Sequence, residues 1–366
     1  MKIVLLVAGG RGGSDFFQGL LDNHKQILQF PGHFLIDNNF YRLLKKAKDN
    51  KFKETAKLFL KVYPYFFNSK LNKIERHDKL GPNKNRFYTV DKDKFINYYI
   101  KLSEEKKNNR IQVIENLHLA YYLARGKKIS NIKIIFIHTH LVSYTKKFLS
   151  FTNTKNFRII HAMKGPMPAL SSPIMNWLNF KNGKFFFPKD LYFQLDIVFK
   201  GITDLLKLDK NLHIVQLENL QKKRKRVMRD FCKIYKIKFE KTLLQCTYFG
   251  FQWWGDQISS RWVFNKKKNV VSKIKEELFF KRDLNFFEYL ALDLIKFYNY
   301  EFKYLRNRKV YFNLLPMKCE LLVWKNTIKH KKIIHIISIP FFYLKRIIFI
   351  NKFFIKFNKL PYSIGF

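Results

Sequence analysis

Residues 3–8 (IVLLVA), followed at once by residues 9–15 (GGRGGSD), decide the fold of this 366-residue chain. An uninterrupted apolar run that ends at a cluster of glycines is typical of a β-strand buried on both faces of a parallel sheet. A secretory signal peptide would need a longer apolar core, of about 7–15 residues, before its cleavage site. We therefore expect a buried first strand and a tight turn directly after it.

Three further apolar runs have the same form: residues 133–140 (KIIFIHTH), 158–163 (RIIHAM) and 212–217 (LHIVQL). Segments with helical spacing lie between them. Strands that alternate with helices predict an α/β protein with a central parallel β-sheet flanked by helices. Ligands bind such sheets at the carboxyl ends of the strands. Functional residues are therefore expected just after Ala8, Ile137, Met163 and Leu217.

Composition excludes several classes of protein. Hydrophobic residues make up 47% of the chain, which rules out a disordered polymer in spite of a net charge of +44. Three cysteines without a CxxC pair exclude a disulfide scaffold and a zinc ribbon, and indicate a reducing compartment. The net charge comes from 71 Lys and Arg against 27 Asp and Glu. Part of it reflects a general use of lysine in place of other residues along the chain. The remainder favours anionic ligands, anionic lipid or nucleic acid as partners.

The chain has no clear linker before about residue 300. We expect residues 1–300 to form one α/β domain, and residues 301–366 to form a helical, basic, aromatic-rich extension. From residue 303 onward, 14 Lys and Arg face one acid, Glu320. Lys345 and Arg346 interrupt the apolar residues 333–350, so two short helices are expected rather than one that spans a membrane. Such helices would lie on an anionic membrane surface, or form a lid on the main domain.

The turn after the first strand has the composition of a phosphate-binding loop. Glycines let successive backbone N–H groups converge on one anion, Arg11 adds a fixed cation, and Ser14 adds a hydroxyl. The loop is P-loop-like without being a Walker A motif, because Ser14 stands where that motif has its lysine. The alternative is an ordinary tight turn between a strand and a helix.

Polar residues also follow the second and third strands. His138 and His140 alternate on a strand and therefore point the same way, which suits a general base. A metal site is less suited, since no Cys, Asp or Glu lies nearby in sequence to complete the ligands. Lys164 and, eight residues on, Ser172 suit a phosphate. Each group also has an alternative interpretation without a function. The histidines would be hydrogen-bonded within the core, and the lysine would lie in a solvated turn.

In this order and spacing, the blocks resemble those of sulfotransferases that use 3′-phosphoadenosine 5′-phosphosulfate (PAPS), over about residues 1–256. Residues 10–15 correspond to the 5′-phosphosulfate loop, and residues 20–24 (LLDNH) to the LLDxHP that follows it in bacterial and carbohydrate members. His138 to Leu141 (HTHL) is similar to the K-T-H-L-P block that carries the catalytic base.

Three later blocks extend the resemblance. Lys164-Gly165-Pro166 with Ser172 is similar to the 3′-phosphate block, residues 216–220 (QLENL) to the YEDL strand end, and residues 247–256 to the late T-x-x-G-x-x-W-x-G block. The departures are Gly12 for Ser, Asp15 for Thr, Lys164 for Arg, Gly165 for Asp and His138 for Lys.

The resemblance implies a sulfotransferase that moves a sulfuryl group from PAPS to a hydroxyl acceptor, such as a glycan or a lipid-linked saccharide, without a metal. It assigns His140 as the base, His138 as the alternate base, and Arg11 to the transferred group. It assigns donor binding to Gly10, Arg11, Gly12, Gly13, Ser14, Asp15, Phe16, Lys164, Ser172, Thr247, Phe249, Gly250 and Trp254.

Two other classes of function stay open. One is a nucleotide-dependent glycosyltransferase or kinase-like enzyme, although no Walker lysine and no DxD at a strand end is visible. The other is a basic nucleic-acid-binding protein, which residues 222–226 (KKRKR) favour. We interpret these residues instead as the solvated face of a helix, and we expect no specific nucleic-acid partner. The expected location is cytoplasmic, with peripheral contact at the inner face of the membrane left open.

Overall fold

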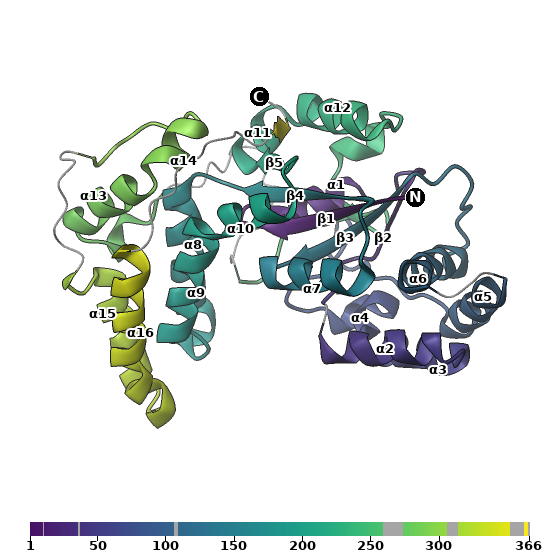
Figure 1. Ribbon diagram of the computed structural model, residues 1–366, viewed down its shortest axis with the longest axis horizontal. Coiled ribbons are helices and arrows are strands. Elements are labelled where there is room, and N and C mark those ends of the chain that lie inside the picture. Colours follow the sequence, from purple (N-terminus) through teal and green to yellow (C-terminus); the bar gives the residue numbers. More distant parts are fainter. Residues whose placement is uncertain are drawn as a thin grey trace.

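The computed structural model describes residues 1–9, 11–35, 37–105, 109–258, 274–305, 314–351 and 362–364. A parallel sheet lies at the centre, in the strand order β2-β3-β1-β4-β5-β8 (Figure 1). Its strands are β1 (Lys2–Ala8), β2 (Ile27–Gln29), β3 (Ile134–His140), β4 (Phe157–Met163), β5 (His213–Gln216) and β8 (Tyr362–Ile364). The expected α/β fold with a central parallel sheet is confirmed.

Alternation along β1 divides the core into two layers, one on each face of the sheet. Ile3, Leu5 and Val7 belong to a core formed with helices on one face, and Val4 and Leu6 to a core on the other. The first face is covered by α2 (Asn38–Lys48), α3 (Phe52–Val62), α4 (Pro64–Phe67), α5 (Lys92–Glu104), α6 (Arg110–Ala124), α7 (Val142–Thr152) and α10 (Gly201–Leu208). The second face is covered by α1 (Ser14–Leu20), α11 (Leu217–Lys222), α12 (Arg224–Tyr235) and the hairpin of β6 (Thr247–Tyr248) and β7 (Phe251–Gln252).

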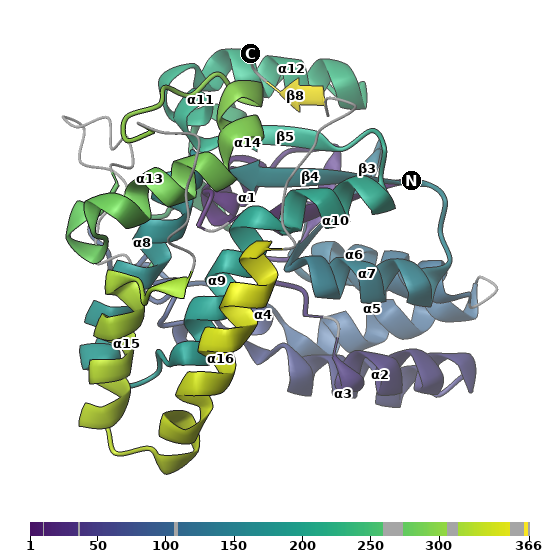
Figure 2. The same ribbon diagram turned by 60° about the vertical axis from the view of Figure 1, so that its left-hand side comes forward.

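A third core lies in a helical unit beside the sheet (Figure 2). Its helices are α8 (Pro166–Asn179), α9 (Pro188–Phe199), α13 (Lys281–Leu290), α14 (Leu292–Phe297), α15 (Lys318–Lys329) and α16 (Ile333–Asn351). This core joins residues 167–199 to residues on both sides of residue 300, the boundary expected from the sequence. The unit is therefore built from two distant parts of the chain.

The C-terminal apolar residues form one helix, so the expectation of two short helices is wrong. Helix α16 continues through Pro340, Lys345 and Arg346. The charge at Arg346 does not break the helix because the side chain is buried, and its guanidinium lies 3.0 Å from the Glu320 carboxylate in α15. By length and composition alone, Ile333–Ile350 is long and apolar enough to cross a membrane.

Candidate active site

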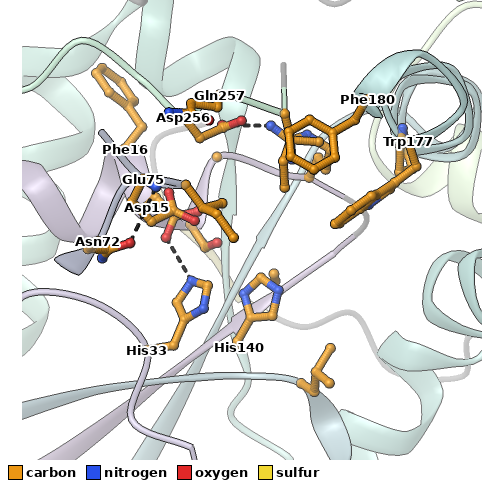
Figure 3. A pocket seen from close by; sticks show the side chains of 18 of the residues that line it. Asp15, Phe16, His33, Asn72, Glu75, His140, Trp177, Phe180, Asp256 and Gln257 are labelled. Atoms are coloured by element: carbon orange, nitrogen blue, oxygen red, sulfur yellow. Dashed lines mark hydrogen bonds and ion pairs between the residues drawn. The ribbon is translucent and has the colours of Figure 1, made fainter. Parts of the chain in front are cut away.

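A cavity of about 1080 Å³ lies at the carboxyl ends of the strands (Figure 3). One side carries polar groups: Arg11, Gly13, Ser14 and Asp15 come from the turn after β1 and the start of α1, next to Phe16, and His140 comes from the end of β3. The opposite side belongs to the helical unit and is mostly aromatic, with Trp177, Phe180, Phe185, Phe186 and Phe193. The fold thus brings the glycine turn and the end of the second predicted strand into one cavity.

The turn after β1 needs its glycines for close packing. A Cβ on Gly12 would lie 2.3 Å from the carbonyl oxygen of Ala162 in β4, and Gly13 has φ 83°, a conformation that favours glycine. Arg11 also has a positive φ, of 57°, and its Nη2 lies 2.6 Å from Oδ2 of Asp256. Gly10, which the sequence placed in the donor loop, lies outside the described residues.

The two expected histidines differ in access to the cavity. A register shift between Leu6 and Val7 in the pairing of β1 with β3 accompanies the positive φ of His140, 62°, at the strand end. His140 lines the cavity, whereas His138 is buried behind it, with Nδ1 2.9 Å from Oε1 of Gln18. Nε2 of His138 lies 3.4 Å from Nδ1 of His140. Burial lowers the pKa of His140 to about 3, so its imidazole is neutral at physiological pH. A pKa this far below neutral also makes the free imidazole a weak proton acceptor.

Two side chains that line the cavity were not foreseen from the sequence: His33, which follows β2, and Glu75, in an irregular segment. Nε2 of His33 lies 2.9 Å from Oδ1 of Asp15, and its ring stacks on that of His140 with 4.1 Å between centroids. The backbone of Glu75 is held by Asn72 and by Trp253, whose indole N–H donates to the Glu75 carbonyl. Neither residue lies in a sequence pattern that would have singled it out.

These groups shift one another's proton affinity. Burial alone would raise the pKa of Asp15, but the imidazoles of His33 and His138 hold it well below its usual range. Burial lowers the pKa of His33, and the Asp15 carboxylate outweighs that effect and raises it. Burial, followed by the charge of Asp15, raises the pKa of Glu75 to about 8. At neutral pH the cluster therefore carries its negative charge on Asp15, beside a protonated Glu75, and the Asp15 carboxylate favours the cationic form of His33.

The three imidazoles also have the composition of a metal site. Ligand nitrogens of His33, His138 and His140 lie within 4.8 Å of one another, and Asp15, His33 and Glu75 form a second such group. One ion bound by both His33 and His140 would have to lie in both ring planes, because imidazole lone pairs lie in the ring plane. These planes are only 22° apart in a stack, so they do not converge on an ion held by all three imidazoles.

The 3′-phosphate block lies at the end of β4 and contacts the YEDL-like block. Lys164 is buried, and the N–H of Gly165 donates to Oε1 of Glu218 at 3.0 Å. Ser172 lies on α8 and is half-buried. Neither Lys164 nor Ser172 lines the cavity.

In the late block, residues 247–256, the residues expected to bind the donor do not line the cavity, whereas Trp253 and Asp256 do. The hydroxyl of Thr247 and the N–H of Gly250 both donate to Oδ2 of Asp22, at 3.0 and 2.7 Å. Phe249 stacks on Tyr88, and the Trp254 indole donates to the carbonyl of Gly81. The members of this segment that line the cavity are Trp253, Asp256, Gln257 and Ile258.

Comparison with protein-family models and with curated proteins gives no match. Among solved structures, the chain is similar to the sulfotransferase domain from the curacin biosynthetic pathway, with a TM-score of 0.40 and 14% identity over 82% of this chain and 98% of that chain. It is also similar to the sulfotransferase domain from the Synechococcus PCC 7002 olefin synthase, with a TM-score of 0.37 and 14% identity over 75% and 86% of the two chains. Because both likenesses are distant, we argue function from the residues of this chain alone.

Proposed function

We propose that the protein is a sulfotransferase that moves a sulfuryl group from PAPS to a hydroxyl acceptor. One observation carries the proposal: a single cavity contains the glycine turn with Arg11 on one strand end and a neutral imidazole, His140, on another. Sulfuryl transfer needs an anion cradle, a cation at the transferred group and a base for the acceptor hydroxyl, held in line. These are the groups that the polar side of the cavity supplies.

In the proposed reaction, the acceptor oxygen attacks sulfur, the bond from sulfur to the bridging phosphate oxygen breaks, and 3′-phosphoadenosine 5′-phosphate leaves. His140 takes the acceptor proton as the new bond forms. Arg11, Gly13 and Ser14 would hold the 5′-phosphosulfate, with Gly10 and Gly12 as parts of the same turn. The negative charge of Asp15 is compensated by His33, which makes a carboxylate in this loop compatible with an anionic donor.

The remainder of the donor would lie toward the ends of β4 and β5. We assign Phe16, which lines the cavity, to the nucleoside. Lys164 and Ser172 lie outside the cavity, and we assign them to the 3′-phosphate on the resemblance of their block alone. The residues of the late block that the resemblance assigns to the donor contact other side chains and backbone groups of the protein: Thr247, Phe249, Gly250 and Trp254. We propose that they stabilise the donor site without touching the donor.

The acceptor would bind against the aromatic wall. Trp177, Phe180, Phe185 and Phe193 offer flat apolar surfaces on which a sugar ring or a hydrocarbon can pack. A glycan or a lipid-linked saccharide fits that wall, and we propose this class of acceptor. A cytoplasmic protein at the inner face of the membrane would meet the lipid-linked form.

Titration calorimetry with 3′-phosphoadenosine 5′-phosphate tests the proposal. Wild-type protein should bind it, and Arg11→Ala should weaken binding more than tenfold, since a charge-assisted hydrogen bond contributes about 1.5–3 kcal/mol. Arg226→Ala is the matched control, because Arg226 is exposed on α12. Binding of ATP or of a uridine diphosphate sugar, without binding of 3′-phosphoadenosine 5′-phosphate, would favour a kinase-like enzyme or a glycosyltransferase instead.

A further inference from the structure

Helix α16 exposes a continuous row of large apolar side chains. Ile333, Ile334, Ile337, Phe341, Leu344 and Ile348 are each between 54% and 81% exposed. At about 100° per residue, these six positions fall within an arc of about 100°, so they form one face of the helix. We call this face the apolar stripe.

The opposite face of α16 is fixed to the helical unit. His335 stacks on Phe187, while Phe342 and Phe349 contact Tyr192 of α9. Arg346 is 1% exposed at its side chain and forms its ion pair with Glu320. These contacts hold α16 flat against the body of the protein, and Figure 2 shows α16 lying alongside α9. The apolar stripe is therefore presented outward on a fixed helix.

On α15, α16 and the turn that joins them, the exposed charges have a single sign, while Asp196 of the neighbouring helix α9 lies close to Lys345. Lys325, Lys329, Lys331, Lys332 and Lys345 are exposed on α15, on α16 and on the turn that joins them. The one acid in residues 314–351 is Glu320, which is buried with Arg346. A partner for this surface must therefore be apolar at the centre and anionic around it.

We propose that the apolar stripe inserts into the interfacial region of an anionic lipid bilayer, with the surrounding lysines on the lipid headgroups. An interfacial helix needs an outward apolar face and nearby cations, and α16 has both. A second copy of this chain is a poorer partner, because pairing two stripes would bring the same lysines together with no exposed acid on α15 or α16 to balance them. A spanning orientation would pull Arg346 and Glu320 out of their buried pair and into lipid, which is costly.

Membrane contact at α16 would also place the cavity close to the bilayer. Helix α9 contributes Phe193 and Ile197 to the cavity wall and Tyr192 to the contact with α16. One helix therefore separates the aromatic side of the cavity from the proposed membrane surface. The membrane proposal itself does not rest on the proposed sulfotransferase activity, and its test uses no donor.

Vesicle flotation with the full-length chain tests the proposal, on phosphatidylcholine vesicles with and without about a third of phosphatidylglycerol. We expect binding to the anionic vesicles that weakens at high salt, and weak binding to the neutral ones. Ile337→Glu should lower the partition coefficient at least tenfold. Phe87→Glu is the matched control, since Phe87 is an exposed aromatic residue on a different part of the surface, and it should bind like the wild type.

Two further measurements test the role of the lysines and the possibility of self-association. Lys331→Gln combined with Lys332→Gln should weaken binding several-fold on anionic vesicles only. Sedimentation without lipid should give a monomer. The proposal is overturned by equal binding of Ile337→Glu and wild type, or by equal binding to neutral and anionic vesicles. A dimer that Ile337→Glu dissociates would overturn it in favour of self-association.

Discussion

Arg11 and Asp256 form an ion pair at 2.6 Å although 245 residues separate them in the sequence. The pair joins the glycine turn after β1 to the segment that follows the β6–β7 hairpin, and both residues line the cavity. An anionic ligand that binds Arg11 must compete with the Asp256 carboxylate. In the proposed function, Asp256 therefore opposes the binding of the donor at Arg11.

Asp256→Asn should accordingly strengthen the binding of 3′-phosphoadenosine 5′-phosphate. Partly exposed ion pairs contribute about 0.2–1 kcal/mol, so we expect the affinity to rise by up to about fivefold. Calorimetry at low salt measures the change, and Asp230→Asn on α12 serves as a control that removes a partly exposed carboxylate elsewhere. If Asp256→Asn weakens binding, Asp256 orients Arg11 for the ligand and does not compete with it.

The sequence predicted the strands that are long and uniformly apolar. β1, β3, β4 and β5 were all identified from their apolar runs, because a strand buried on both faces has no polar alternation to disguise it. β2 and β8 each have three residues, too few for a periodic pattern. α16 was divided in two because Lys345 and Arg346 look like a break. Only the tertiary structure shows that Glu320 neutralises Arg346 inside the protein.

The site was predicted where it follows directly from a strand end. Arg11 and His140 line the cavity because the ends of neighbouring parallel strands meet at one edge of the sheet. His33 and Glu75 come from irregular segments, and their partner Asp15 lies 18 residues from His33. In the sequence, Asp15 stands where the sulfotransferase loop has Thr, and it places a carboxylate near the expected phosphate. The compensating imidazole belongs to a contact that no local pattern encodes.

Asp22 should contribute strongly to stability through the hydrogen bonds from Thr247 and Gly250. Asp22→Ala removes the acceptor of both hydrogen bonds, and at about 1 kcal/mol for each bond it should lower the free energy of unfolding by about 2 kcal/mol. Thr247→Val removes one of the two bonds and should cost about 1 kcal/mol. Urea denaturation measures both changes. Equal stability of Asp22→Ala and wild type would contradict a structural role for this carboxylate.

Glu75 should make the protein less stable as the pH rises. Its pKa is about 8 in the folded state against an ordinary value of 4.5. Between these two values the folded state binds more protons than the unfolded state, so the free energy of unfolding falls as the pH increases. His33, whose pKa is also raised, adds a loss in the same direction above its ordinary value of 6.5.

Glu75→Gln keeps a neutral side chain at every pH and should remove the Glu75 part of that loss. Relative to wild type, the variant should gain about 1–2 kcal/mol between about pH 5 and about pH 9, less than the full shift because Glu75 is only half-buried. Urea denaturation at the two pH values measures this difference. Glu104→Gln is the control, since Glu104 is exposed at the end of α5 and its replacement should not change the slope.

His140 should be the catalytic base, with His138 as the residue that positions it. His140→Ala should lower turnover by about 10²- to 10⁴-fold while the affinity for 3′-phosphoadenosine 5′-phosphate stays nearly constant, because a base acts on the acceptor proton. Since burial lowers the pKa of His140 to about 3, the wild-type rate should not fall between about pH 7 and about pH 5 through protonation of this group. An ordinary imidazole would lose activity in that range.

His138→Ala should have the smaller effect on turnover. His138 is buried, Gln18 holds its Nδ1, and its Nε2 faces His140 at 3.4 Å, so it reaches the reaction only through His140. Its variant should change the pH profile, because the ring nitrogen that faces Nδ1 of His140 is lost. Measurement of turnover against pH for both variants, with donor affinity as the control, separates the two roles. If His138→Ala abolishes activity and His140→Ala does not, the roles of the two imidazoles are reversed, and if neither matters the base lies elsewhere in the cavity.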